Sequence, residues 1–310
     1  MATTTSQVRI GGVAQEYKRP ARSLWADAWF TFTRDRFAMV GLVMLVILVA
    51  ATLIGPFFYE RPMGVIDFSR GLEGPSLEHP FGTDDLGRDL LGRLLWGGRV
   101  SIAVGITAVI IAISLGTAVG ALAGYFRKLD NPLMRFTDVF LSLPILPLLL
   151  VIIYLFREAI AARFGPDLGI FIMIVTVIGV LNWMPVARLV RASFLSLKNK
   201  EFVEAARATG STDRRIIFGH ILPNVLSPIL VAATIGVGGA ILTESTLSFL
   251  GLGFPPDVPT WGRLLYDAQN FIDIAPHWVI FPGLCIFLIV LSINYIGDGL
   301  RDALDPRRRI

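Results

Sequence analysis

Six long apolar segments constrain this chain more than any other feature of its sequence. They cover about residues 37–58, 100–126, 133–156, 168–190, 225–250 and 278–300. A helix needs roughly 20 mostly apolar residues to cross the hydrocarbon core of a bilayer, and every segment reaches that length. Only 17% of the 310 residues are charged, whereas a soluble domain carries about 25%. The pattern predicts an all-α, polytopic membrane bundle of six transmembrane helices.

The distribution of Lys and Arg predicts how the chain threads through the membrane. Cytoplasmic loops of membrane proteins carry an excess of these residues. With the N-terminus inside, 20 of the 28 basic residues fall on the cytoplasmic side. The first outside loop, residues 60–99, holds five basic and seven acidic residues. We therefore expect both termini in the cytoplasm, an N-in/C-in topology.

This threading divides the chain into regions. We expect a cytoplasmic N-terminal segment at residues 1–36 and a first span with its outside loop at residues 37–99. The main transmembrane domain follows at residues 100–302 and contains a cytoplasmic loop at 191–223. A cytoplasmic tail covers residues 303–310. In the first region Trp25, Trp29 and Phe32 fall at helical spacing among charged residues. They predict a short interfacial helix before the first span.

Small and helix-breaking residues indicate how the spans pack. Gly116, Gly120 and Gly124 repeat every four residues, which places them on one helix face and favours close contact with a neighbouring helix. Pro144 interrupts the third predicted span and Pro185 the fourth, and a proline removes a backbone hydrogen bond and kinks the axis. Kinked helices fit a bundle with a central, water-accessible cavity.

Polar groups inside a membrane span are costly and tend to mark function. Glu244 and Asn182 are the candidates for a transport pathway or gate. A structural ion pair or hydrogen bond is the alternative interpretation for Glu244. Asp138 is expected near the inner interface, where Arg135 can pair with it.

The chain lacks the motifs of common enzyme classes. It contains no Walker A pattern, no Gly-x-Gly-x-x-Gly, no Gly-x-Ser-x-Gly and no His-Glu-x-x-His. His79, His220 and His277 fall on both sides of the predicted membrane, and the single cysteine, Cys285, can form neither an internal disulfide nor a zinc cluster. We expect no catalytic, cofactor or metal site and, at a net charge of +4, no nucleic-acid partner. Uphill transport would need an ion gradient or a partner protein.

The connection between the fourth and fifth spans predicts a helix–glycine–helix elbow. A short helix begins near Glu201 and ends at Gly210, since glycine adopts the left-handed conformation past a helix end at little cost. Ser211, Thr212 or Asp213 can cap a second helix. A long, ordered, basic cytoplasmic connection of this kind indicates docking to another protein.

The elbow resembles the signature of permease subunits of ATP-binding-cassette importers, which is Glu-Ala-Ala, three residues, Gly, and a stretch ending in Leu-Pro. Segments 79–89, 246–253 and 297–306 resemble one branch, the dipeptide, oligopeptide and nickel permeases, and within it the C-type partner of each permease pair. The resemblance covers about residues 22–306. The elbow residues that carry it are Glu204, Ala205, Ala206, Gly210, His220, Leu222 and Pro223.

The resemblance implies a type I importer transmembrane domain in the bacterial inner membrane, surrounded by lipid. A second homologous permease would complete a heterodimer, and two ATP-binding-cassette ATPase subunits would hydrolyse ATP, so this subunit is not itself an enzyme. The elbow would seat in an ATPase groove as the coupling helix. An extracytoplasmic solute-binding protein would deliver di- or oligopeptides to an alternating-access pathway.

Other functions remain open at this point. Nickel, glutathione or another small solute fits the same architecture. A secondary transporter would favour repeated halves, and the sequence shows no such repeat. A membrane enzyme is disfavoured by the missing catalytic set.

Overall fold

The computed structural model describes residues 24–59 and 63–304, and within them the chain is almost entirely helical. The elements are α1 (Leu24–Phe32), α2 (Arg36–Phe58), η1 (Phe68–Arg70), α3 (Leu90–Tyr125), α4 (Arg127–Leu141), α5 (Ile145–Phe164), α6 (Pro166–Leu181), α7 (Trp183–Leu197), α8 (Glu201–Ala208), α9 (Asp213–Arg215), η2 (Ile216–Ile221), α10 (Leu222–Phe249), α11 (Trp261–Ala268), η3 (Gln269–Phe271) and α12 (Pro276–Leu304). An isolated bridge joins Thr83 to Asp89. The tail beyond residue 304 and most of the predicted N-terminal segment lie outside the described residues.

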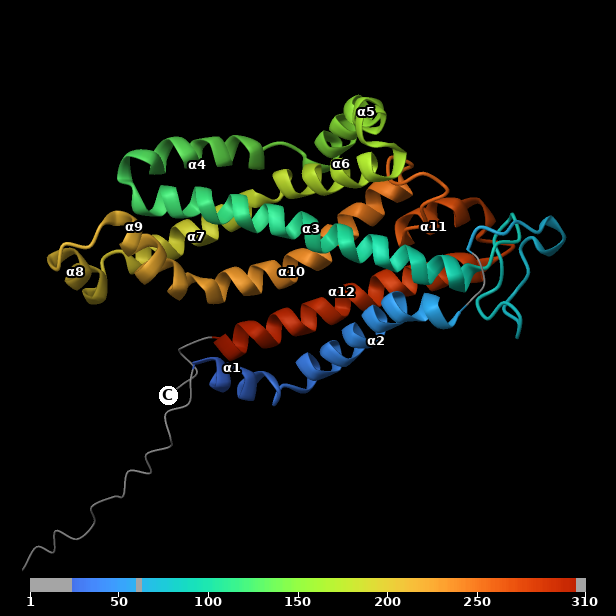
Figure 1. Ribbon diagram of the computed structural model, residues 1–310, viewed down its shortest axis with the longest axis horizontal. Helices are drawn as coiled ribbons and strands as arrows, with labels where there is room; N and C mark the ends of the chain where they lie inside the picture. The colour runs from blue at the N-terminus through green and yellow to red at the C-terminus, as the bar shows by residue number, and fades with distance from the viewer. Residues whose placement is uncertain (1–23, 60–62, 305–310) are drawn as a thin grey trace, which may run out of the picture.

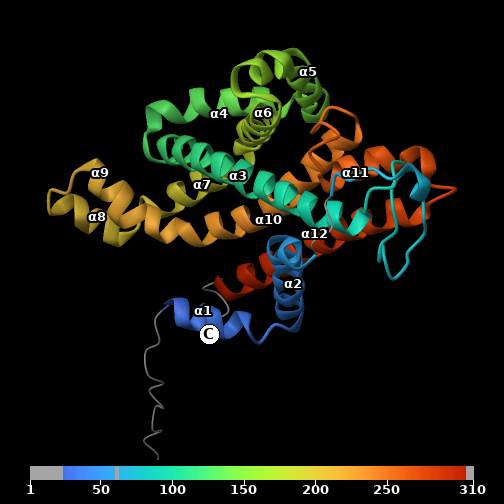
Figure 2. The same ribbon diagram turned by 45° about the vertical axis from the view of Figure 1, so that its right-hand side comes forward.

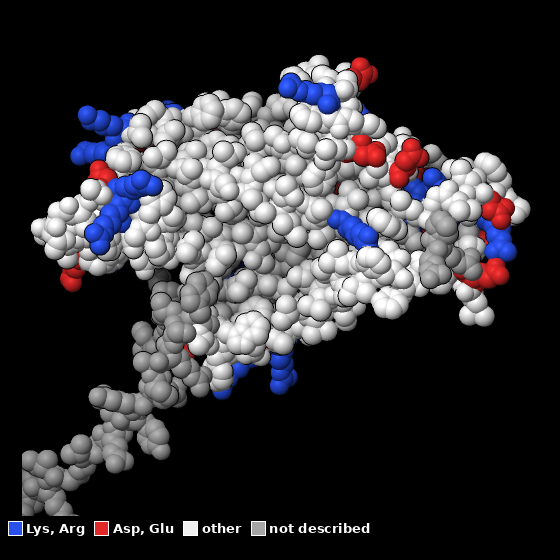
Figure 3. All heavy atoms as spheres, viewed as in Figure 1, with Lys and Arg blue, Asp and Glu red and all other residues white. Residues whose placement is uncertain are grey.

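Six helical stretches in the described residues are long and apolar enough to cross a membrane, which confirms the predicted number. They are Arg36–Phe58, Leu90–Tyr125, Ile145–Phe164, Pro166–Leu197, Asp213–Phe249 and Pro276–Leu304. Large apolar side chains on their outer faces are exposed, among them Ile47, Ile110 and Phe287. Most of the charged side chains on the visible face lie toward the two ends of the molecule, and few lie in the middle (Figure 3). That distribution suits a protein surrounded by hydrocarbon.

The third span differs from the sequence prediction. Residues 133–156 do not form one helix, because the chain breaks between α4 and α5 at residues 142–144. Pro144 has extended backbone (φ −68°, ψ 108°), and a proline disfavours the helical conformation for the residue before it. The apolar span is therefore α5, and α4 is a separate helix that contacts α3 and α7. α5 extends to Phe164, beyond the predicted end of the span at residue 156, and therefore includes Arg157.

The fourth span is interrupted at Asn182, between α6 and α7. Pro185 causes the interruption. Its ring clashes with the carbonyl of Leu181, four residues earlier, and its backbone nitrogen has no hydrogen to donate to that carbonyl. Asn182 closes α6 by donating its side-chain Nδ2 to the carbonyl of Ile178 at 2.7 Å. The predicted kink is present, and it places a polar side chain in the middle of an apolar stretch.

The helices pack around α3, which runs the length of the molecule (Figure 1). It contacts α7, α10, α6 and α2, while α12 lies along both α10 and α2. α5 and α6 form a pair at one side, visible when the molecule is turned (Figure 2). The elbow from α8 to η2 lies at one end, and α11 lies with the loop preceding α3 at the other.

The predicted glycine face of α3 packs directly against α7, which confirms the packing prediction. A Cβ added at Gly120 would lie 2.5 Å from the carbonyl oxygen of Ala187 on α7, and one at Gly116 would lie 2.7 Å from that of Trp183. At Gly124 it would meet Phe194 Cβ at 2.5 Å. Lipid chains are as apolar as the helices, so association in a bilayer relies on such close van der Waals contact.

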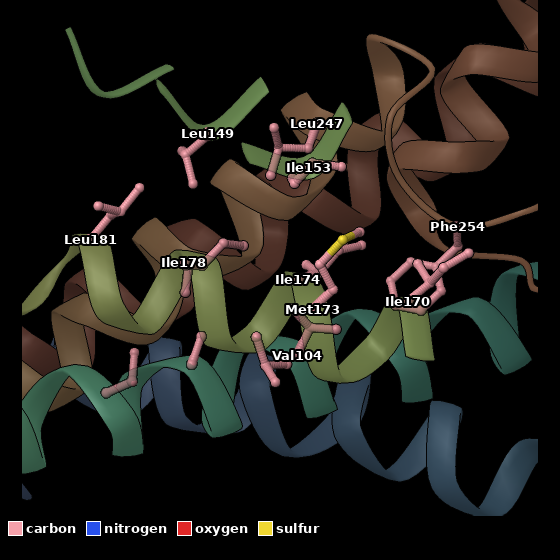
Figure 4. Packing of buried hydrophobic residues seen from close by; sticks show 14 residues of the cluster. Val104, Leu149, Ile153, Ile170, Met173, Ile174, Ile178, Leu181, Leu247 and Phe254 are labelled. Carbon is pink, nitrogen blue, oxygen red and sulfur yellow. The ribbon is translucent and has the colours of Figure 1, made fainter. Parts of the chain in front are cut away.

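A buried apolar cluster lies beside this contact. Ile170, Ile174 and Ile178 project from one face of α6 toward Val104 on α3, while Ile153 of α5 and Leu247 of α10 close the other side (Figure 4). Each of these side chains is at most 4% exposed. The cluster joins four helices and holds α5 on the bundle.

The expected helix before the first span is present as α1. Phe32 is buried against Ala38 and the backbone of Gly299, whereas Trp29 on the same helix is 60% exposed. α1 thus rests on the end of α12 with part of its aromatic surface free. An interfacial position for it stays a prediction.

Replacing Gly120 with leucine should destabilise the bundle by about 1–3 kcal/mol or more, because the side chain has no room between two backbones. The melting temperature of the purified protein measures this loss. Gly283→Ala is the matched control, since a Cβ there meets nothing within 4 Å. A Gly120→Leu melting temperature equal to that of the control would disprove the contact.

Candidate functional site

The elbow between α7 and α10 begins with a helix end that requires glycine. Gly210 has a φ of +80°, the left-handed conformation that side chains rarely adopt. Its N–H donates to the carbonyl of Arg207 at 2.9 Å, and the N–H of Ser211 donates to that of Ala206 at 3.0 Å. These two bonds form a Schellman motif, the usual way in which a helix ends at glycine. The predicted helix end is confirmed.

One face of α8 is buried and the other is free. Val203 and Ala206 pack into an apolar cluster with Ile217, Ile221 and Phe194. The opposite face, with Glu204, Ala205 and the turn at Gly210, is exposed. A Cβ at Gly210 would meet no atom within 4 Å, so the tip of the elbow is open. The exposed tip is thus carried on a packed support.

Polar contacts tie the elbow to the end of α3. The Tyr125 hydroxyl donates to Asp213 Oδ1 at 2.5 Å, and Lys198 Nζ donates to the carbonyl of Gly124 at 2.9 Å. The Arg207 guanidinium lies 6.0 Å from the centre of the Tyr125 ring. The elbow therefore moves with α3 and α7 and not as a free loop.

The second half of the elbow differs from the expected α-helix. α9 is only three residues long, and residues 216–221 form a π-helical segment, η2, that leads into α10. Thr212 precedes α9 but makes no side-chain capping bond. Short π-helical segments inside helices occur often at functional sites.

The predicted coupling residues fall into two groups. Glu204, Ala205 and Gly210 lie on the exposed tip, with Ala206 buried beneath them. His220, Leu222 and Pro223 lie on the returning segment, where Leu222 packs on the apolar cluster and the His220 carbonyl accepts from Asn224. The structure therefore separates an outward-facing group from a supporting one.

Two ion pairs connect α4 to α7 above the elbow. Arg191 donates to both oxygens of Asp130, at 2.5 and 2.8 Å. These hydrogen bonds hold the pKa of Asp130 below its ordinary value. Asp138 pairs with Arg188 at 2.5 Å, and not with Arg135 as the sequence suggested. Arg135 precedes Asp138 by only three residues on α4, whereas Arg188 reaches it from the adjoining helix.

A groove of about 440 Å³ lies between α3, α7 and α10. Asn182 and Pro185 line it from the break in the fourth span, and Gly239 and Thr243 line it from α10. A Cβ at Gly239 would meet nothing within 4 Å, so this glycine faces open space. The predicted pathway residue Asn182 thus lies on a groove with an apolar lining and few polar groups.

Glu244 lies next to the groove but does not line it. Its carboxylate is fully buried and accepts hydrogen bonds from the Ser248 hydroxyl at 2.7 Å and the Ser101 hydroxyl at 3.2 Å. Ser101 in turn accepts from the backbone N–H of Trp261 at 3.2 Å. The side chain joins α10 to α3 and to the start of α11, and it has no ion pair among the described residues.

The end of the molecule opposite the elbow holds a buried ion network that the sequence analysis missed. Arg93 on α3 is 2% exposed and contacts Asp84 at 2.5 Å and Asp267 on α11 at 3.5 Å. Arg88 also binds Asp84, and Arg263 binds Asp267, at 2.6 and 2.8 Å. Arg93 lies at the start of the apolar helix α3. The sequence alone placed it among the basic residues of the first outside loop and gave no sign of its burial.

The segment 79–89, which carried part of the family resemblance, forms a compact turn above this network. The His79 ring lies 2.8 Å from Asp89, and Tyr59 donates to the same carboxylate at 2.8 Å. A Cβ at Gly87 (φ +73°) would lie 1.8 Å from the carbonyl oxygen of Asp67, so only glycine fits there. In the described part of the chain, no group of three or more His, Cys, Asp or Glu residues could hold a metal ion.

Comparison with known proteins assigns the arrangement to a family. Residues 112–310 match the family described as binding-protein-dependent transport system inner membrane component, and residues 23–75 match the N-terminal transmembrane domain of oligopeptide transport permease C. Among solved structures, a chain of the inward-facing MetNI methionine ABC transporter superposes with a TM-score of 0.55 at 21% identity. The match covers 68% of this chain and 96% of that one.

Curated relatives match along nearly the whole chain. The dipeptide transport system permease protein DppC of Alkalihalophilus pseudofirmus is 42% identical, over 93% of this chain and 92% of its own. The oligopeptide permease OppC of Haemophilus influenzae is 40% identical, over 95% and 92%. The glutathione permease GsiD of Pectobacterium atrosepticum is 38% identical, over 93% of both chains.

The buried Glu244 cluster leads to a stability prediction. Glu244→Gln should change the free energy of unfolding little, because the amide oxygen still accepts from Ser248. Glu244→Leu should cost about 1–3 kcal/mol, since buried hydroxyls lose their acceptor. Thermal unfolding of the purified variants separates the two. Equal stability of both variants would show that the hydrogen bonds do not hold the helices together.

Proposed function

The chain belongs to the family of binding-protein-dependent transport system inner membrane components, and we propose that it forms half of the pathway of an ATP-driven peptide importer. The family and the six apolar helices make it a multi-pass protein of the inner membrane. Peptide cargo is supported by relatives named for dipeptide and oligopeptide transport at 40–42% identity. Glutathione, itself a small peptide, is the second candidate because of the relative named for its transport.

The exposed tip of the elbow is the observation that supports coupling to ATP hydrolysis. Glu204, Ala205 and Gly210 project from a packed support, as expected of a surface that enters a groove on another protein. The chain has no Walker A pattern, so hydrolysis is assigned to two separate ATPase subunits. Movement of those subunits would reach the groove through α8 and then α7, which runs from just before α8 back to the break at Asn182.

The groove is assigned to the transport pathway. It is bounded by α3, α7 and α10, and its polar groups are few, as suits a passage that must not hold its cargo tightly. A second homologous permease would close its open side and complete a heterodimer. Glu244, enclosed by hydroxyls and outside the groove, is assigned a structural role near the gate and no direct contact with cargo.

The mechanism is alternating access between two packed states. ATP binding would bring the two ATPases and the two elbows together, and the bundle would open outward to receive cargo from the binding protein. Hydrolysis would restore the inward-facing state. The proposed division into residues 1–36, 37–99, 100–302 and 303–310 follows the same threading, with the elbow in the cytoplasm.

Cysteine labelling tests the threading. A cysteine introduced at Lys198, on the elbow side, should be protected from an impermeant thiol reagent in cells with a permeabilised outer membrane. One at Asp257, beside α11, should react. The excess of basic residues around the elbow supports this orientation. Labelling at position 198 alone would reverse it.

Gly210→Val tests the elbow. The substitution strains a residue at φ +80° by roughly 1–2 kcal/mol and enlarges the tip. We expect the six helices to insert normally, while ATPase co-purification, cargo-stimulated ATP hydrolysis and uptake fall at least several-fold. Gly219→Val is the control, because that glycine lies in η2 without a positive φ and with space around it. Wild-type uptake by Gly210→Val, with the ATPases still bound, would show that the elbow is not the coupling element.

A further inference from the structure

A polar pocket of about 340 Å³ opens at the end of the molecule opposite the elbow. Its walls come from the turn before α3 and from the segment around α11. The side chains that shape it include Asp85, Arg88, Arg263, Tyr266, Asp267 and Asn270. It shares no lining residue with the groove between α7 and α10.

The walls of this pocket are held rigidly from below. Arg93, buried under it, binds Asp84 beneath one wall and Asp267 in the other, and donates to the carbonyl of Pro256 at 3.3 Å. Arg263 is fixed by Asp267 at 2.8 Å and lies 4.6 Å from the ring centre of Tyr266. The pocket is therefore preformed.

Three arginines and three aspartates lie in and under the pocket, and Asp85 is the one aspartate among them without an ion pair in the described residues. Asp84 and Asp267 are each contacted by two arginines. Asp85 has no ion pair and no hydrogen bond to another side chain among the described residues. Burial and the neighbouring Asp84 raise the pKa of Asp85 by more than the nearby Arg88 lowers it. Asp85 is therefore the carboxylate of this pocket that is available to form an ion pair with an incoming positive charge, beside the already paired Arg88 and Arg263.

Apolar surface adjoins the pocket on the outer loop. Phe68 is 75% exposed, and its neighbour Asp67 donates its backbone N–H to the carbonyl of Leu86, a pocket residue, at 3.0 Å. Leu77, farther along the loop, is fully exposed. Exposed aromatic side chains beside charged groups are typical of protein–protein interfaces.

We propose that this pocket receives a basic side chain, lysine or arginine, of the extracytoplasmic binding protein, with Asp85 as its counter-ion. The inference rests on the proposed function and on its orientation. Residues 60–99 carry seven acids against five bases, and residues 251–277 carry three against one, so this end attracts a basic surface. Acidic side chains are visible there in Figure 3. Separation from the groove favours a docking partner over cargo.

Docking of the importer's own binding protein, fluorescently labelled, onto the complete importer in nanodiscs tests the proposal. Asp85→Asn should weaken docking about fivefold at low salt, and Asp85→Lys should weaken it further through repulsion. Asp273→Asn is the matched control, because Asp273 is an exposed acid between η3 and α12, at the same end of the molecule, and does not line the pocket. Basal ATP hydrolysis should be unchanged in all three variants.

The outcomes separate this proposal from the proposed function. If the binding protein docks equally well to the wild-type importer and to the Asp85→Asn importer, the assignment of the pocket is overturned, while the importer function stands. Absence of docking to the wild-type importer would overturn both. Asp85-dependent binding of labelled trialanine without any binding protein would show that cargo occupies the pocket, which also overturns the proposal.

Discussion

The contact between the backbones of α3 and α7 is the constraint on which the rest of the structure depends. Three glycines spaced four residues apart remove the side chains that would separate these helices, so the carbonyls of Trp183 and Ala187 lie against α3. Because α7 continues into the elbow, the same contact sets the position of the exposed tip. In a bilayer no hydrophobic force draws two apolar helices together, and close packing takes its place.

The two ends of the bundle use charge differently. At the elbow, Asp130–Arg191 and Asp138–Arg188 lie near the surface and connect neighbouring helices. At the opposite end Arg93 is almost fully buried between carboxylates. A buried charge is retained only with partners, so its network holds the outer loop and α11 in one arrangement. The pairs at the elbow end are partly exposed, whereas those of Arg93 at the opposite end are buried.

Between the ends, the breaks in the helices decide where space remains. Pro185 disrupts the fourth span and leaves Asn182 on the groove, while Gly239 leaves the facing wall open. Glu244 lies one residue from the groove-lining Thr243 yet points into a cage of hydroxyls. A single step along a helix turns a side chain by about 100°, which is enough to move it from the lining of a groove into a packed interface.

The sequence by itself determined the number of spans, the glycine-mediated packing, the helix end at Gly210 and the family, because each depends on local periodicity or on a short motif. It did not determine that the third span begins after Pro144, that Asp138 pairs with Arg188, or that Arg93 is buried between Asp84 and Asp267. Those features depend on which helices become neighbours. Only the tertiary structure decides that, since it joins side chains more than 160 residues apart into one network and leaves Asp85, beside it, without an ion pair in the described part of the chain.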